Sequence, residues 1–145
     1  MPAGRHFLQI PGPTNVPDRV LRAIDRPTID HRGPEFQVLG QEVLAGIRRI
    51  FKTRHPVVIY PASGTGAWEA ALVNTLSPGD TVLASVFGQF SLLWVDLCQR
   101  FGLTVDAIQV DWGKGVPLDQ YRARLEADTQ HKIKAVLVTQ NETAT

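Results

Sequence analysis

Cysteine is almost absent from this sequence, and so is any long apolar run. The single cysteine, Cys98, excludes an internal disulfide and is typical of a reducing compartment. Charged residues interrupt every apolar stretch well short of the roughly 18 residues that a membrane-spanning helix requires. The opening residues, "MPAGRHFLQI", lack the apolar core of a secretory signal. We therefore expect a soluble, cytoplasmic protein with no membrane partner.

The sequence also has no large excess of positive or negative charge. The 15 Lys and Arg residues and the 14 Asp and Glu residues leave a formal net charge of +1. Charge alone therefore gives no reason to expect a nucleic-acid partner. The histidines are scattered, with no cysteine or carboxylate at ligand spacing, so we expect no metal site. They are His6, His31, His55 and His131.

Proline, in contrast, is abundant near the N-terminus. Proline removes amide donors and disfavours helix in the residue before it. We therefore predict an extended arm over residues 1–35, with at most a short helix at Asp18–Ile24, and a domain over residues 36–145. The prolines of the arm are Pro2, Pro11, Pro13, Pro17, Pro27 and Pro34.

After the arm, helical and strand patterns alternate. Apolar residues at three- and four-residue spacing predict a helix from Phe36 to Ile50. Short β-rich runs then alternate with longer helical runs. We predict strands at Val57–Tyr60, Thr81–Ser85, Thr104–Val110 and Ala135–Thr139, and helices at Ala67–Leu76, Phe90–Phe101 and Leu118–Ala127.

This alternation indicates an α/β fold with a parallel sheet. Strands that are separated by helices are joined by right-handed crossovers, which make neighbouring strands parallel. The runs "VVIY" and "AVLVT" are apolar on both faces, as buried parallel strands are. Because the sequence stops directly after the last predicted strand, at "NETAT", we expect it to be the front part of a longer protein.

The stretch "YPASGTGAWEAAL", Tyr60 to Leu72, places a glycine-rich turn between a predicted strand and a predicted helix. In open α/β sheets, ligands lie where the carboxyl ends of strands meet helix N-termini. Gly64 and Gly66 permit a close approach of the backbone. Free amides of the first helical turn attract anions, and the hydroxyls of Ser63 and Thr65 add donors. The turn therefore predicts a phosphate cradle.

Two common phosphate motifs are excluded. The turn has no Gly-Lys-Ser/Thr, so it is not a nucleoside-triphosphate P-loop. Glu69 stands where the dinucleotide fingerprint has its third glycine. A small phosphorylated ligand remains. On this stretch alone, helix capping by Ser63 and Thr65 explains the residues equally well.

Five motifs, in order along the chain, resemble those of one family. They are "PGPTNVP", "DHRGPEF", "ASGTGAWEAALVNTLSPGD", "FGQFSLLWVDLCQRFG" and "NETAT". They are similar to motifs of the class V, fold-type I pyridoxal-phosphate aminotransferases, in the serine–glyoxylate and alanine–glyoxylate branch. The resemblance extends from Pro11 to Thr145. It implies that residues 36–145 are the front portion of the α/β large domain, with the rest of that domain and the C-terminal domain absent.

The resemblance also implies roles for single residues. The turn Ser63–Thr65 matches the family's cradle for the phosphate of pyridoxal phosphate. Phe90 matches the aromatic residue that stacks on the cofactor ring, a suitable surface for a planar heterocycle. Thr143 matches a hydroxyl beside the cofactor and the substrate. Gly12 lies in the segment that matches an arm close to the substrate.

No catalytic residue is assigned within the chain. In the family, the acid at the pyridine nitrogen and the lysine that forms the aldimine are expected beyond Thr145. The lysines present end a helix, lie in a turn or lead into a strand, so none receives that role. They are Lys52, Lys114, Lys132 and Lys134. The chain by itself is therefore expected to be inactive.

For the complete protein, the resemblance implies transamination of an amino acid, serine or alanine, with glyoxylate, which yields glycine. Small amino acids and keto acids would be its partners, together with a second copy in a homodimer. The alternative is a truncated, non-catalytic module that binds a small phosphate ligand or a partner chain.

Other conspicuous residues have structural interpretations. We interpret His31 as part of a turn that leads into a helix rather than as an acid–base group. Trp94 and Cys98 are four residues apart and are expected in the core. Trp68 is expected to pack beneath the glycine-rich turn rather than to touch the cofactor ring.

Overall fold

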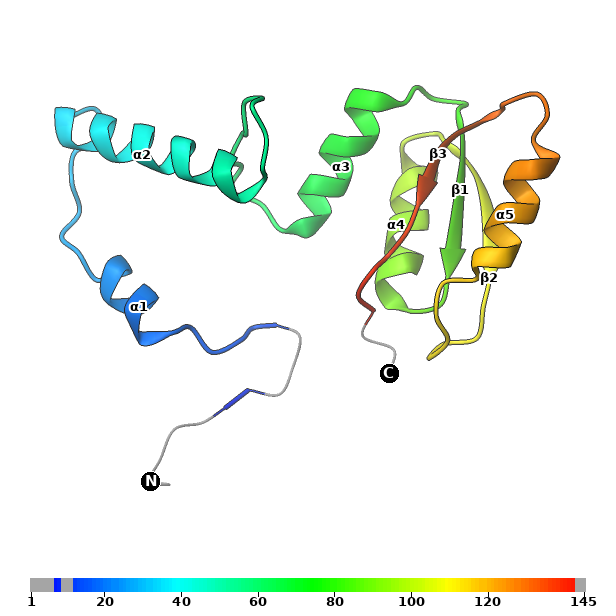
Figure 1. Ribbon diagram of the computed structural model, residues 1–145, viewed down its shortest axis with the longest axis horizontal. Helices are drawn as coiled ribbons and strands as arrows, with labels where there is room; N and C mark the ends of the chain where they lie inside the picture. Colours follow the sequence, from blue (N-terminus) through cyan, green and yellow to red (C-terminus); the bar gives the residue numbers. More distant parts are fainter. Residues whose placement is uncertain (1–6, 9–11, 143–145) are drawn as a thin grey trace. The chain divides into compact units, whose positions relative to one another are not determined.

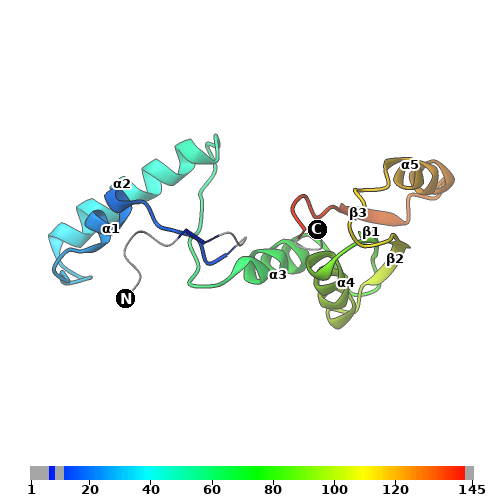
Figure 2. The ribbon, with the colours of Figure 1, turned by 90° about the horizontal axis from the view of Figure 1, so that it is seen from below.

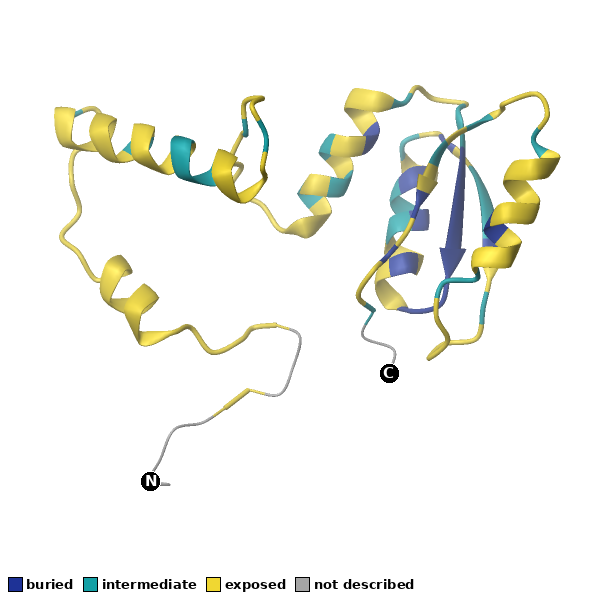
Figure 3. Ribbon diagram, viewed as in Figure 1, coloured by how far each residue is buried: buried dark blue, intermediate teal, exposed yellow. Residues whose placement is uncertain are grey.

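The computed structural model describes residues 7–8 and 12–142, which belong to two compact units, Met1–Ile59 and Tyr60–Thr145. The first unit contains helices α1 (Asp18–Ile24) and α2 (Pro34–Ile50) (Figure 1). The short helix is confirmed at its predicted bounds. The longer helix begins two residues before Phe36, because Pro34 occupies its first turn, where a missing N–H costs nothing. Neither helix contains a buried residue (Figure 3).

The second unit alternates helices with strands, as the sequence predicts. The strands form one parallel sheet in the order β2-β1-β3, with Thr81 of β1 paired with Thr104 of β2 and Ile133 of β3. The α/β fold class is therefore confirmed. The elements are α3 (Gly64–Thr75), β1 (Thr81–Val86), α4 (Gln89–Arg100), β2 (Thr104–Gln109), α5 (Leu118–Ala127) and β3 (Ile133–Leu137).

The strand predicted at Val57–Tyr60 does not form, and that prediction is wrong. The segment has no regular secondary structure, and its last three side chains are 55–68% exposed. A β-strand requires a neighbour with which its backbone can form a ladder of hydrogen bonds. The sheet β2-β1-β3 contains all the strands among the described residues, and this segment is not one of them. An apolar run reveals burial propensity, but it does not reveal a pairing partner.

Alternate residues of the central strand β1 supply two separate cores. Val82, Ala84 and Val86 face a cluster that includes Cys98 of α4, while Leu83 faces Ile108 and Tyr121. This alternation follows from the two-residue period of a strand. Helices α4 and α5 accordingly lie on opposite faces of the sheet (Figure 2). The sheet thus fixes the position of α4, whose N-terminus follows the carboxyl end of β1.

A buried hydrogen-bond network ties α5 to two strands. The hydroxyl of Tyr121 lies 2.8 Å from the carbonyl oxygen of Leu137 and 2.9 Å from Oγ of Ser85. A phenol donates one hydrogen, so it donates to the carbonyl and accepts from the serine hydroxyl. Burial raises the pKa of Tyr121, and the hydrogen bonds with Ser85 lower it in part. The neutral phenol is therefore the form that this core holds.

Replacing Tyr121 with phenylalanine is expected to lower the free energy of unfolding by about 1–3 kcal/mol. The change leaves Ser85 and the carbonyl of Leu137 buried without their phenol partner. Urea denaturation of the chain, followed by tryptophan fluorescence, measures the loss. Tyr60→Phe is the matched control, because Tyr60 is 68% exposed and its hydroxyl remains replaceable by water. Equal effects of the two changes would contradict the network.

Candidate functional site

The first turn of α3 contains the predicted phosphate cradle. Ser63 is the N-cap residue, with φ −88° and ψ 178°, and its side chain does not cap the helix. The amide of Gly66 donates to the carbonyl oxygen of Ser63 at 3.0 Å. Among the described residues, the amides of Gly64 and Thr65 have no acceptor. The first turn therefore exposes two amide donors at the positive end of the helix dipole.

The two glycines of the turn, Gly64 and Gly66, differ in the space available for a side chain. A Cβ atom on Gly66 would lie 2.8 Å from Cβ of Ala62, so a larger residue would displace the turn. A Cβ atom on Gly64 would meet nothing within 4 Å. Gly66 is therefore needed for the fold of the turn, whereas the space beside Gly64 would admit a side chain.

An aromatic cluster connects this turn with α4. The ring of Phe90 meets the ring of Trp68 edge-on, with centroids 6.5 Å apart and planes at 76°. Trp68 in turn stacks on Trp94, with centroids 5.0 Å apart. Phe90 remains 40% exposed. The fold thus places a half-exposed aromatic ring next to the second turn of α3, one turn after the cradle.

The core interpretation of α4 is confirmed. Cys98 is fully buried, and Trp94 packs against the same apolar cluster. Burial raises the pKa of the Cys98 thiol to about 11, so the thiol is neutral and unreactive near pH 7. Trp68 packs on Trp94, as expected of a packing residue.

Sequence reasoning missed a role for Glu142. Its carboxylate accepts hydrogen bonds from the amides of Phe90 at 3.2 Å and Ser91 at 2.5 Å. Oγ of Ser91 accepts from the amides of Phe87 and Gly88, both at 3.1 Å. The first turn of α4 is therefore capped by the protein itself, unlike that of α3. A detectable signal was the glycine before α4, which has no side chain to cap the helix.

The structure does not test the roles of two predicted site residues, Gly12 and Thr143. Gly12 is exposed and belongs to the unit Met1–Ile59, which is described separately from the cradle. Thr143 lies outside the described residues. The roles of both residues beside the substrate remain predictions.

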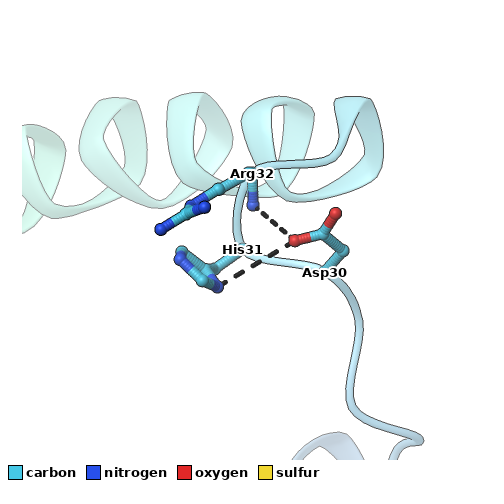
Figure 4. A network of polar contacts seen from close by, with 3 residues as sticks. All are labelled: Asp30, His31 and Arg32. Carbon is cyan, nitrogen blue, oxygen red and sulfur yellow. Dashed lines mark hydrogen bonds and ion pairs between the residues drawn. The ribbon is translucent and has the colours of Figure 1, made fainter.

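The Asp30–Arg32 segment forms a turn that leads into α2 (Figure 4). Oδ1 of Asp30 accepts a hydrogen bond from the amide of Arg32 at 2.9 Å, and Nδ1 of His31 lies 4.0 Å from the same oxygen. Both side chains of the His31–Asp30 pair are more than 70% exposed. The turn interpretation of His31 is confirmed.

The described part of the chain contains neither a group of metal-binding side chains nor a membrane-spanning helix. Within residues 7–8 and 12–142, no group of three His, Cys, Asp or Glu side chains could hold a metal ion. In the same residues, no helix has the length and apolar character to cross a membrane.

Comparison with known proteins gives a consistent result. The family model described as aminotransferase class-V matches residues 6–145. The serine–glyoxylate aminotransferase of Hyphomicrobium methylovorum is 52% identical over 139 residues, which are 95% of this chain and 34% of that protein. The L-aspartate–glyoxylate aminotransferase of Paracoccus denitrificans is 50% identical over 137 residues, which are 94% of this chain and 35% of that protein. The chain thus spans about a third of the length of these curated relatives.

A solved structure supports the fold. The crystal structure of an alanine–glyoxylate aminotransferase from Nostoc sp. matches with a TM-score of 0.75 and 30% sequence identity. The match covers 99% of this chain and 39% of that one. The two-unit chain therefore has the fold of the corresponding part of that enzyme.

Proposed function

This chain belongs to the class-V aminotransferases, which use pyridoxal phosphate, and we propose that it forms the cofactor-holding part of a glyoxylate aminotransferase. The resemblance that the sequence motifs indicated is confirmed by the family match and by relatives of 50% identity or more. Family membership favours this function over a non-catalytic module. This chain spans about a third of the length of its relatives. The proposed activity is therefore that of the whole protein to which this chain belongs.

The observation that carries the proposal is the difference between two helix N-termini. The amides of Phe90 and Ser91 in α4 already bind the carboxylate of Glu142. The amides of Gly64 and Thr65 in α3 have no acceptor among the described residues. A dianionic phosphate therefore fits α3, where the exposed hydroxyls of the turn add further donors.

The aromatic cluster fits the ring of the same cofactor. Phe90 is 40% exposed, and its ring makes a T-shaped contact with the ring of Trp68. We propose that the exposed part of the Phe90 ring stacks on the pyridine ring, since offset stacking suits a planar heterocycle. When bound, pyridoxal phosphate supplies the electron withdrawal that makes the α-hydrogen of an amino acid acidic. The described residues bind and orient that group, and we assign none of them the proton transfer.

Class-V aminotransferases act on amino acids and keto acids. The names of three relatives share glyoxylate and differ in the amino donor, which is serine, L-aspartate or alanine. We propose glyoxylate as the amino acceptor and serine as the donor, since the serine enzyme of Hyphomicrobium methylovorum is 52% identical. Gly12 and Thr143 are proposed to lie beside the substrate.

An assay of glycine formation tests this function. The protein that carries this chain is supplied with pyridoxal phosphate, glyoxylate and one donor at a time: serine, alanine or aspartate. Serine is expected to give the fastest formation of glycine. A protein that binds pyridoxal phosphate but forms no glycine with any donor would contradict the proposed activity.

Two further features of the proposal concern the whole protein. We propose a homodimer, supported by the apolar stripe of α2, in which Phe36, Leu39 and Val43 are 43–46% exposed. An uncovered apolar stripe of this kind is typical of a partner surface. A cytoplasmic location is supported by the low cysteine content, since Cys98 is the single cysteine of the sequence.

A further inference from the structure

The segment after β3 reaches across to the first turn of α4 (Figure 1). Glu142 lies 52 residues from Phe90 in sequence, yet its carboxylate accepts from the amides of both Phe90 and Ser91. Each bond is charge-assisted, and the positive end of the helix dipole strengthens both. The carboxylate therefore holds the backbone of Phe90, while Trp68 contacts the ring of the same residue.

Gly88 provides the space for this contact. A Cβ atom built on Gly88 would overlap the Cγ, Cδ and Oε2 atoms of Glu142. The backbone of Gly88 is extended, so any residue type could adopt its conformation. The need for glycine at this position therefore comes from the side chain of Glu142. A larger residue would displace the carboxylate from α4 without changing its chemistry.

We propose that Glu142 is a positioning residue for the cofactor ring, acting through Phe90. Two groups from distant parts of the sequence contact this residue: Glu142 accepts from its amide, and Trp68 contacts its ring. Loss of the carboxylate frees the first turn of α4 and lets the phenyl ring leave the plane in which it stacks. The inference rests on the proposed function, because it concerns the surface that meets pyridoxal phosphate.

Binding of two cofactor forms tests the proposal in the protein that carries this chain. Glu142→Gln and Gly88→Ala are each expected to weaken binding of pyridoxal phosphate about twofold to tenfold, the size of an aromatic contact. The affinity for phosphate-free pyridoxal should fall by the same factor, because neither substitution changes the phosphate cradle. Glu126→Gln is the matched control, since Glu126 is an exposed glutamate of α5. It should leave both affinities unchanged.

A double-variant cycle separates positioning from general destabilisation. In a Phe90→Ala background, Glu142→Gln should have no further effect on the affinity for either cofactor form. Induced circular dichroism of the bound cofactor should fall in Glu142→Gln, because the ring is held less firmly. Independent, additive effects of the two changes would overturn the proposal, as would an unchanged dichroism signal.

Amide hydrogen exchange tests the contact without any cofactor. In the cofactor-free form of the protein that carries this chain, the amides of Phe90 and Ser91 should exchange slowly, and both should exchange faster in Glu142→Gln. Fast exchange in the unchanged chain would overturn the contact itself. If the unchanged protein does not bind pyridoxal phosphate, the proposed function fails together with this inference. If it binds and both variants bind equally well, the inference alone fails.

Discussion

Replacing Gly64 with proline is expected to weaken the binding of pyridoxal phosphate about 10- to 150-fold, the value of one hydrogen bond to a charged group. Gly64 is the first residue of α3, a position at which proline fits and its missing N–H leaves the helix intact. Ser63 has ψ 178°, in the region that a following proline favours. The change therefore removes one donor from the cradle and preserves the helix.

Gly64→Ala is the matched control for this prediction. Alanine keeps the amide, and its Cβ would meet nothing within 4 Å. We expect Gly64→Ala to bind pyridoxal phosphate almost as well as the unchanged protein. Titration of both variants with pyridoxal phosphate and with phosphate-free pyridoxal measures the effect. Equal losses for the two ligands in Gly64→Pro would show that the amide does not contact the phosphate.

Replacing Leu83 with alanine is expected to lower the free energy of unfolding by about 2–5 kcal/mol. Leu83 is fully buried in the central strand β1, where it packs with Ile108 and Tyr121. The change removes apolar contacts and leaves a cavity that a sheet residue cannot easily close. Such a loss is a large part of the stability of a small domain, so a substantial unfolded population is expected at room temperature.

Leu118→Ala tests whether the loss at Leu83 is due to burial. Leu118 is 70% exposed at the start of α5, so its truncation should change the free energy of unfolding by no more than about 0.5 kcal/mol. Urea denaturation followed by the fluorescence of the stacked pair Trp68 and Trp94 measures both variants. Similar midpoints for the two variants would contradict the assignment of Leu83 to the core.

Local patterns determined most elements of the second unit. The helix at Leu118–Ala127 was predicted at its observed bounds, and the strands β1 and β2 were predicted within one residue. These patterns depend on residues a few positions apart, which the sequence displays directly. The segment Val57–Tyr60 has an equally apolar pattern but no strand neighbour among the described residues. Its failure shows that strand pairing is a non-local property.

The sequence by itself determined where the predicted cradle, Ser63–Thr65, and the aromatic residue Phe90 lie: at the starts of two helices. Only the tertiary structure decided which helix N-terminus is open to an anion. In α4 the amides of Phe90 and Ser91 bind Glu142, and in α3 the side chain of Ser63 leaves the amides free. The physical reason is the separation along the chain. Glu142 lies 52 positions from Phe90 and 51 positions from Ser91, and contacts at such separations leave no local pattern in the sequence.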